Sequence, residues 1–363
     1  LEAASHAERA VDEAACLGPN LLAEGDLATL LKLFESDADL TRLVKREQQR
    51  ASSTILPPLP DDFELSAATL LEHAKRWGLE GDQIVAHHLV GERLLAELSG
   101  DSDYVSRLAA NANLGAMRLL VLGAGGSGKS RLISSIIEMF EAVGKRHWLA
   151  VTAITGAAAS IVGGQTIDSL IGTHAHKTVK QRREDQDLLL SDSDCSLSVS
   201  GRRLKDVKFV ICDEWSMLGH YHLSLLDQAL RQERGSSAHL DFAGVNMLFF
   251  GDGAQLPPIG ERALYLAPQE EGARCEANRR GAELWASLTH VVRLRKQFRA
   301  AADQPFVALL ERLRYGSCSE ADVKLLNSRV LSPGAVQDLM LASDATYLTG
   351  RNAIRTDVAF RHA

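Results

Sequence analysis

A glycine-rich segment with one lysine and one serine is the first place in this chain that could bind phosphate. Residues 123–130 read Gly-Ala-Gly-Gly-Ser-Gly-Lys-Ser, which fits the pattern G-x-x-x-x-G-K-[ST]. Glycines let backbone N–H groups wrap around phosphates, and the start of a following helix adds a favourable dipole. We expect Lys129 to reach the β- and γ-phosphates of ATP and the Ser130 hydroxyl to bind Mg²⁺. The residues expected to hold the nucleotide here are Gly123, Ala124, Gly125, Gly126, Ser127, Gly128, Lys129, Ser130 and Arg131.

A pair of adjacent acids could complete this chemistry. Residues 209–214 read Phe-Val-Ile-Cys-Asp-Glu, an apolar run that ends in two carboxylates. We expect Asp213 to bind Mg²⁺ through water, and Glu214 to polarise the attacking water as a general base. An isolated Asp-Glu pair is usually a solvated turn. Its occurrence behind a phosphate-binding loop is what favours the catalytic interpretation.

A glutamine follows another apolar run. Residues 251–258 read Gly-Asp-Gly-Ala-Gln-Leu-Pro-Pro. The amide of Gln255 could bond both a γ-phosphate oxygen and the attacking water, and so sense the state of the nucleotide. The alternative is a turn stiffened by the two prolines.

Four short apolar runs must position these residues. They lie at 117–123, 147–153, 207–213 and 245–251. Runs of this length, rich in branched and aromatic residues, are typical of buried parallel strands. Apolar residues recur at helical spacing before Gly144, which can cap a helix, and residues 66–110 also have a helical pattern. Strands that alternate with helices predict a layered α/β domain that binds ligands at the carboxyl ends of its strands.

Composition limits the class of protein. The net charge is −7, so any contact with nucleic acid must come from local groups rather than from an overall basic field. Five cysteines without a Cys-x-x-Cys pair argue against a disulfide framework or a zinc ribbon. The sequence has neither a signal peptide nor a run of about 18 apolar residues, which predicts an intracellular protein without membrane association. The start at Leu1, without methionine, indicates a fragment.

The chain is expected to have three parts. Residues 1–60 form a helical or partly disordered extension that ends in a linker at Pro57, Pro58 and Pro60. Residues 61–295 form the α/β domain, with a surface insertion at about 173–205 that is either a solvated loop or a DNA contact. Residues 296–363 form a further, helical part.

Three other features are not interpreted as sites. His220 and His222, two apart on an expected helix, make a poor chelate, and His174 with His176 is read as a surface pair. Cys212 falls inside an expected strand and is read as a buried, inert thiol.

Six segments in order carry a resemblance to a known family. They are LEGDQ with Gln83, GAGGSGKS, TAITGAAASIVGGQTIDS, DEWSM, GDGAQLPP and LRKQFR with Arg299. Together they resemble the Pif-type (petite integration frequency) DNA helicases of superfamily one, and in particular the helicase portion of Helitron-like transposable elements. The resemblance covers roughly residues 75–361.

The resemblance implies a RecA-like P-loop domain followed by the beginning of a second RecA-like domain. It implies ATP and Mg²⁺ as ligands, single-stranded DNA or a DNA fork as partner, and movement from 5′ to 3′. Gln83 would bond the adenine edge, and Arg299 would join the catalytic set at the γ-phosphate. Thr155, Gly156, Thr166 and Ser169 match segments that hold single-stranded DNA. Repair, recombination, telomere maintenance and transposition all use such motors, in the nucleus or mitochondrion of a eukaryote.

The sequence also departs from the family. Asp168 stands where a histidine is usual, and an acid there would repel DNA phosphates. Gly253 replaces an aromatic residue, which loosens a packing contact, and Trp215 replaces a small branched residue and is expected to be buried against the sheet. The later motifs of the second motor domain are absent. These departures support an alternative, a degraded transposon-derived module that binds ATP or DNA without turnover. A small-molecule phosphotransferase is the third possibility.

Overall fold

The computed structural model describes residues 59, 63–100, 115–172, 204–299 and 303–330. The chain divides into two compact units, residues 1–296 and 297–363. The expected extension at 1–58 and residues 173–203 of the expected insertion lie outside the described residues.

The first unit is built on a six-stranded sheet whose paired strands are all parallel, in the order β3-β2-β4-β5-β1-β6. The strands are β1 Arg118–Gly123, β2 Leu149–Ala153, β3 Gln165–Thr166, β4 Phe209–Asp213, β5 Asn246–Gly251 and β6 His290–Leu294. The four strands expected from the apolar runs are confirmed. The sequence pattern missed β3, which has two residues, and β6, an edge strand whose exposed and buried residues alternate.

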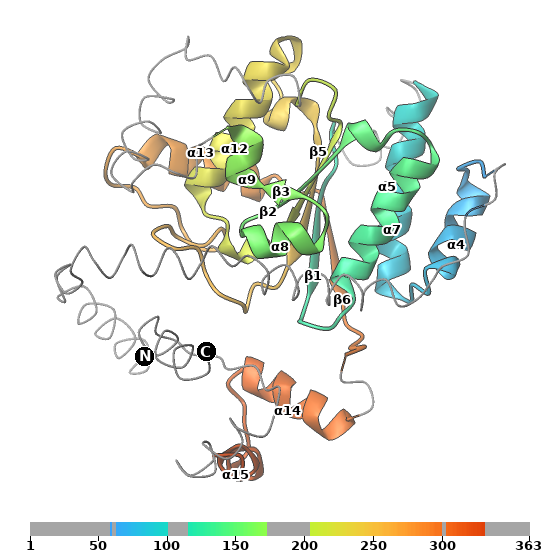
Figure 1. Ribbon diagram of the computed structural model, residues 1–363. Coiled ribbons are helices and arrows are strands. Elements are labelled where there is room, and N and C mark those ends of the chain that lie inside the picture. The colour runs from blue at the N-terminus through green and yellow to red at the C-terminus, as the bar shows by residue number, and fades with distance from the viewer. Residues whose placement is uncertain (1–58, 60–62, 101–114, 173–203, 300–302, 331–363) are drawn as a thin grey trace, which may run out of the picture. The chain divides into compact units, whose positions relative to one another are not determined.

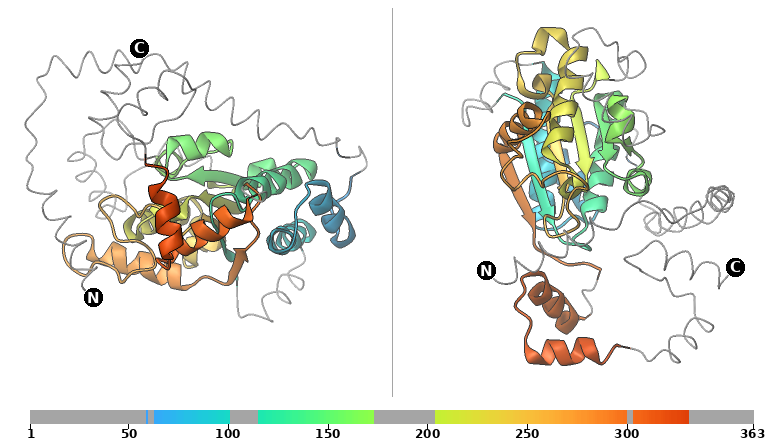
Figure 2. Two further views of the ribbon diagram at one scale, coloured as in Figure 1. Left: turned by 90° about the horizontal axis from the view of Figure 1, so that it is seen from below. Right: turned by 90° about the vertical axis from the view of Figure 1, so that its left-hand side faces the viewer.

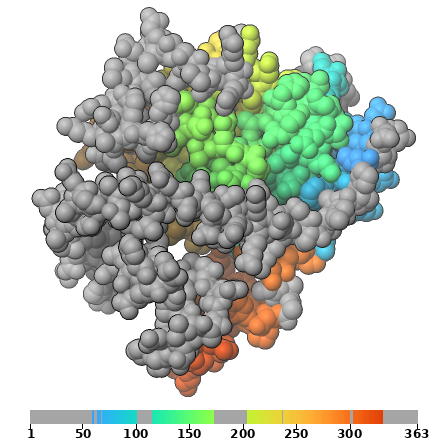
Figure 3. All heavy atoms as spheres, in the orientation of Figure 1, coloured from blue at the N-terminus to red at the C-terminus, as the bar shows by residue number. Residues whose placement is uncertain are grey.

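Helices cover both faces of the sheet (Figure 1), which confirms the expected α/β fold class. One face packs against α4 Ala67–Arg76, α5 Asp82–Ser99 and α7 Lys129–Ala142, and α4 lies on the outside of this layer (Figures 1 and 2). The other face packs against α9 Ile167–Ile171, α12 His220–Glu233 and α13 Cys275–Ala286. The short helix α8 is Gly156–Ile161, and the 3₁₀ turns are η1 Arg146–Trp148, η2 Trp215–Met217, η3 Gly235–Ser237 and η4 Asp241–Gly244. Residues of α7 and α8 form part of one face of the molecule (Figure 3).

Local sequence explains where the helices begin and end. The helix α7 buries Leu132, Ile136 and Phe140 at helical spacing. It ends at Ala142, shortly before Gly144, whose φ of 65° is the left-handed conformation that glycine adopts readily. In its described part, residues 66–100, the expected helical pattern is divided into α4 and α5, because Gly78 and Gly81 take positive φ between them.

The second unit contains α14 Gln304–Arg314 and α15 Glu320–Asn327 in its described part. The side chain of Asp303 caps α14, and a capping box of Ser319 and Asp322 begins α15. The Arg312 guanidinium donates two hydrogen bonds to the Asp322 carboxylate, over 2.7 and 2.6 Å. That this unit is the start of a second motor domain stays a prediction. No helix in the described part of the chain is long and apolar enough to cross a membrane.

Candidate nucleotide-binding site

The parallel sheet brings the three predicted segments to one edge. Gly123 ends β1, Asp213 ends β4 and Gly251 ends β5. In the pairing register, Asp213 is opposite Phe250, and Gly251 is opposite Leu122. Since all these strands run in the same direction, the loops that follow them share one edge, where ligands bind in open α/β sheets.

The loop after β1 is shaped as a cradle around the lysine. The Lys129 ammonium donates to the backbone carbonyls of Gly123, over 2.7 Å, and of Ala124, over 3.4 Å, and the residue is 9% exposed. Gly128 has a φ of 83°, and a Cβ at Gly123 would lie 2.3 Å from the Ser127 Oγ, so both positions require glycine. The Ser127 Oγ is buried and has no hydrogen-bond partner in the described part of the chain. Glycines, a lysine and a helix start in this arrangement fit the phosphates of a nucleotide.

The two acids at the end of β4 differ in environment. Asp213 is 6% exposed. Burial, and then the neighbouring charge of Glu214, raise the pKa of Asp213 to about 6, against the opposing effects of the Glu214 N–H and of Lys129. The Asp213 carboxylate and the hydroxyl of Ser130, an exposed residue in the first turn of α7, are oxygen donors of the hard type that Mg²⁺ takes. Glu214 is half-buried with φ 55° and ψ 44°, a strained backbone conformation that is often associated with function.

Gln255 lies in a tight turn beyond β5. Its side chain is exposed, and its N–H donates to the backbone carbonyl of Asp252 over 2.9 Å. The buried carboxylate of Asp252 accepts from the Ala254 N–H over 3.1 Å. The turn expected as the alternative is therefore present, and it presents the glutamine to solvent at the edge of the site. The sensing role of Gln255 stays a prediction.

Gln83 makes contacts that the sequence did not indicate. It is 3% exposed, and its amide donates to the carbonyls of Ser127 (3.1 Å) and Gly128 (3.4 Å) in the P-loop. Its Oε1 accepts from the Glu80 N–H over 3.1 Å. Gln83 therefore connects the start of α5 to the P-loop, and its bond to adenine stays a prediction. The Arg131 Nε donates to the Trp77 carbonyl at the α4 C-terminus, and the nucleotide contact expected of Arg131 stays a prediction.

The residues expected to contact DNA lie at two helix starts. The Thr155 hydroxyl caps α8 by accepting from the Ala158 N–H, and the Thr166 hydroxyl caps α9 by accepting from the Ser169 N–H, each over 3.2 Å. Gly156 is the first residue of α8 and is exposed, as is Ser169 in α9. Both segments follow strands of the same edge, and their DNA contacts stay a prediction.

Asp168 has a histidine neighbour. The Nε2 of His222 on α12 lies 3.8 Å from the Asp168 carboxylate, and its Nδ1 contacts the Glu261 carboxylate. Burial lowers the pKa of His222, but the hydrogen bond and charge of Glu261 and the charge of Asp168 outweigh it, so the pKa is raised. A histidine that holds its proton more tightly partly neutralises Asp168. Sequence reasoning set His222 aside as a poor chelate with His220, and its partners Asp168 and Glu261 are distant in the chain.

The expectation that Gly253 loosens a packing contact is wrong, because Trp215 fills the space. Trp215 is 3% exposed, which confirms its expected burial. A Cβ at Gly253 would lie 3.3 Å from the Trp215 Cη2, so the indole lies directly against this glycine. The large side chain of Trp215 therefore occupies the space beside the small residue Gly253.

Other titratable residues take structural positions. Cys212 is buried in β4, and burial raises the pKa of its thiol, as expected for an inert cysteine. His220 is buried at the start of α12. The described residues contain no group of three or more histidine, cysteine or acidic side chains that could hold a metal ion. His174 and His176 lie outside the described residues, and Arg299 is exposed in the second unit.

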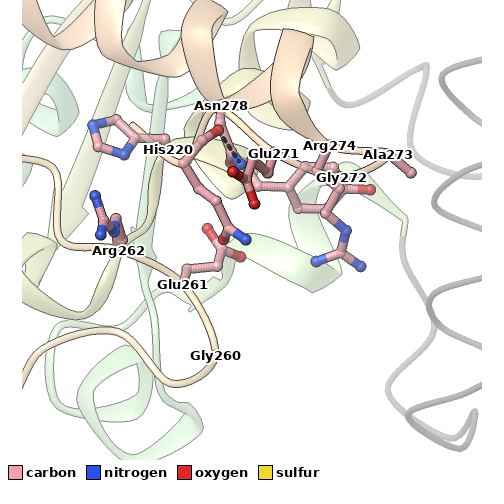
Figure 4. A pocket seen from close by; sticks show the side chains of 11 residues that line it. His220, Gly260, Glu261, Arg262, Glu271, Gly272, Ala273, Arg274 and Asn278 are labelled. Carbon is pink, nitrogen blue, oxygen red and sulfur yellow. Dashed lines mark hydrogen bonds between the residues drawn. The ribbon is translucent and has the colours of Figure 1, made fainter. Parts of the chain in front are cut away.

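A separate pocket of about 260 Å³ lies at the start of α12 (Figure 4). Its charged side chains include Glu261, Arg262, Glu271 and Arg274. The two acids balance the two arginines, and none of the residues predicted from the sequence lines it. The pocket therefore has no charge preference for a nucleotide, and the catalytic residues lie elsewhere.

Comparison with known proteins places the chain among DNA helicases. Residues 101–324 match the family described as PIF1-like helicase. The chain is 28% identical over 267 residues to the ATP-dependent DNA helicase PIF1 of Saccharomyces cerevisiae, a match that covers 71% of this chain and 28% of that protein. It is 33% identical over 257 residues to the ATP-dependent DNA helicase PIF5 of Trypanosoma brucei brucei, covering 66% of this chain and 26% of that protein.

A solved structure of a Pif1 helicase has a similar fold. The crystal structure of the Pif1 helicase from Candida albicans is similar with a TM-score of 0.50 and 24% identity, over 72% of this chain and 52% of that chain. The chain thus spans about a quarter of the length of the two curated relatives.

Proposed function

The chain belongs to the PIF1-like helicase family, and on that premise we propose that it binds ATP with Mg²⁺ and hydrolyses it as part of a DNA helicase motor. The observation that carries the proposal is the P-loop of the first unit. Its lysine is already directed into the loop, and its charge acts on the buried carboxylate of Asp213 at the end of β4, two strands away in the sheet. A nucleotide's phosphates would replace the carbonyl oxygens of Gly123 and Ala124 as partners of Lys129.

The remaining groups have separate tasks. Ser130 and Asp213 would hold Mg²⁺, which offsets the charge that develops on the phosphates when it is bound. Glu214 takes a proton from the attacking water, and Gln255 orients that water against the γ-phosphate. Arg299 would act on the same phosphate from the second unit.

The motor is proposed to move along single-stranded DNA from 5′ to 3′ and to separate strands at a fork. The starts of α8 and α9 are the proposed DNA contacts, because they follow the same sheet edge as the nucleotide site. Closure of two domains around ATP would move these contacts by steps. DNA repair, recombination and telomere maintenance are the proposed settings, inside the cell and in the nucleus or mitochondrion of a eukaryote.

The alternative is a module that binds ATP or DNA without turnover. Asp168 and Gly253 are two of the three sequence features that support it, beside the later motifs of the second motor domain, and each of these two residues has a compensating neighbour, His222 and Trp215. Little in the described residues therefore favours the alternative over the motor.

The direct test is ATP hydrolysis with and without single-stranded DNA, beside the Lys129→Ala variant. A motor gives turnover that rises with DNA and disappears in the variant. If the chain binds ATP and neither protein turns it over, the binding module is the correct reading.

A further inference from the structure

Trp215 lies between the proposed general base and the glutamine loop. It follows Glu214 directly and begins the turn η2. Its indole packs against Trp285, with ring centroids 4.9 Å apart, and against the edge of Tyr265 at 6.4 Å. A Cβ at Gly251 would lie 2.7 Å from the Trp215 Cδ1. The indole therefore extends along the backbone that leaves β5.

The loop of Gln255 is fixed from two sides. On one side, the buried Asp252 carboxylate accepts from the Ala254 N–H. On the other, the Trp215 ring lies 3.3 and 3.5 Å from where a Cβ of Gly253 would be. Between them, this carboxylate and this ring determine where residues 252–255 lie.

Glu214 is fixed by the same side chain. Its φ of 55° is unfavourable for a residue other than glycine, and such a conformation persists only where its surroundings hold it. The next residue is anchored in the core, because Trp215 is 3% exposed and its ring is enclosed by other aromatic rings. Burial of the indole thus offsets the cost of the left-handed turn.

We propose that Trp215 is a positioning residue that sets the distance between Glu214 and Gln255, with Gly253 as its matched partner. The proposal rests on the proposed function, in which these two residues act on one water molecule. Trp215 directly follows Glu214 in the chain, and its rigid indole ring packs against the loop that carries Gln255. Neither residue can shift independently of the other while the ring stays in place.

The test exchanges the large and the small side chain between positions 215 and 253. Trp215→Val removes the ring, Gly253→Phe supplies one from the opposite side, and the double variant does both. We expect Trp215→Val to lower kcat for ATP about 10- to 100-fold with a KM change of about twofold or less, since misplacement by about 1 Å has effects of this size. Trp215→Phe should retain most of kcat, and the double variant should recover at least half of the loss on a logarithmic scale. Two results would overturn the proposal. One is a fall in kcat accompanied by a large change in KM, and the other is a double variant whose kcat is as low as that of the worse single variant.

Two further measurements keep the result independent of turnover and of folding. The first is the affinity for ADP with aluminium fluoride, which mimics the transferred phosphoryl group, relative to ADP alone. Trp215→Val should lose this preference and keep ADP binding, whereas a wild-type chain that binds neither ligand would refute the proposed function. The second is thermal unfolding. Gly253→Phe should lower Tm, and Trp215→Val in the same chain should restore part of it; additive losses in Tm would refute the pairing.

A matched control comes from another glycine. A Cβ at Gly235 meets nothing within 4 Å, whereas one at Gly253 meets the Trp215 ring. Gly235→Phe should therefore leave kcat and the aluminium fluoride preference unchanged. A loss of kcat as large as that of Gly253→Phe would mean that bulk anywhere on this unit is harmful, and would overturn the specific pairing.

Discussion

The side-chain amide of Gln83 donates a hydrogen bond to the backbone carbonyl of Ser127, at the centre of the P-loop, over 3.1 Å. The two residues are 44 positions apart in the chain. Gln83 is buried, and a second bond to Gly128 makes it a brace between α5 and the loop. The family resemblance gives the same glutamine a different role, contact with the adenine edge. The two roles predict different specificities.

Gln83→Leu removes both amide contacts while it keeps an apolar stem of similar size. If the brace dominates, we expect KM for ATP and for GTP to rise by the same factor, about 5- to 150-fold for the loss of two buried hydrogen bonds at about 0.5–1.5 kcal/mol each. If adenine contact dominates, only the preference for ATP over GTP disappears. Steady-state hydrolysis of both nucleotides separates the two results, and Glu72→Gln, at an exposed position of α4, serves as the control.

The two acids at the end of β4 should give opposite defects. Glu214→Gln removes the general base, so kcat should fall by about 10²- to 10⁴-fold while Mg²⁺-dependent ATP binding persists. Asp213→Asn removes a carboxylate from the proposed Mg²⁺ site, so binding itself should weaken and require more Mg²⁺. Fluorescent nucleotide titrations at several Mg²⁺ concentrations, alongside turnover, measure both effects. Equal loss of binding in the two variants would contradict the assigned roles.

Asp168 should weaken DNA binding only slightly. Its neighbour His222 lies 3.8 Å away, and its raised pKa favours the charged form, which would offset part of the charge of Asp168 and of Glu261. We expect Asp168→Asn to strengthen binding to single-stranded DNA by about two- to fivefold, and less at high salt, because the effect is electrostatic. Fluorescence anisotropy at two salt concentrations tests this. Glu141→Gln, at the far end of α7, is a control that should change nothing.

A buried histidine pair should make the first unit sensitive to acid. The Nδ1 of His73 lies 3.0 Å from the Nε2 of His87, and both residues are at most 1% exposed. Burial, and then the charge of His73, lower the pKa of His87 to about 3. Burial also lowers the pKa of His73, although the nearby carboxylate of Glu138 opposes this.

The lowered pKa values of His73 and His87 determine how the stability of the first unit changes with pH. Unfolded histidines bind protons below a pH of about 6.5, whereas the folded pair stays neutral. The stabilisation is therefore complete above about pH 6.5 and is lost as the pH falls toward the folded pKa, by up to about 1.4 kcal/mol per pH unit for each group. Thermal melting between pH 7.5 and 5 should show a falling Tm. His87→Gln should flatten that slope, and an unchanged slope would show that other groups are responsible.

Local sequence was enough to identify the nucleotide site and the class of fold. A P-loop depends on glycines and a lysine at fixed spacing within eight residues, and buried parallel strands are continuous apolar runs, so both leave a local signal. The two-residue strand β3 and the edge strand β6 left no such signal. Their pairing depends on neighbours that are distant in the chain, such as Leu294 beside Gly123.

The tertiary structure decided what surrounds those residues. Gln83 and Ser127, Asp168 and His222, and Trp215 and Gly253 are pairs separated by dozens of positions. Taken alone, Asp168, Trp215 and Gly253 are departures from the family pattern, and His222 is a poor chelate. Gln83 and Ser127 are expected contacts of the nucleotide. A side chain's charge and free volume depend on what the folded sheet places within a few ångströms of it. Spacing along the chain does not indicate those neighbours. The sequence therefore determined which chemistry is proposed for the site, and the packing of the sheet and its helices determined how the parts of the site are held.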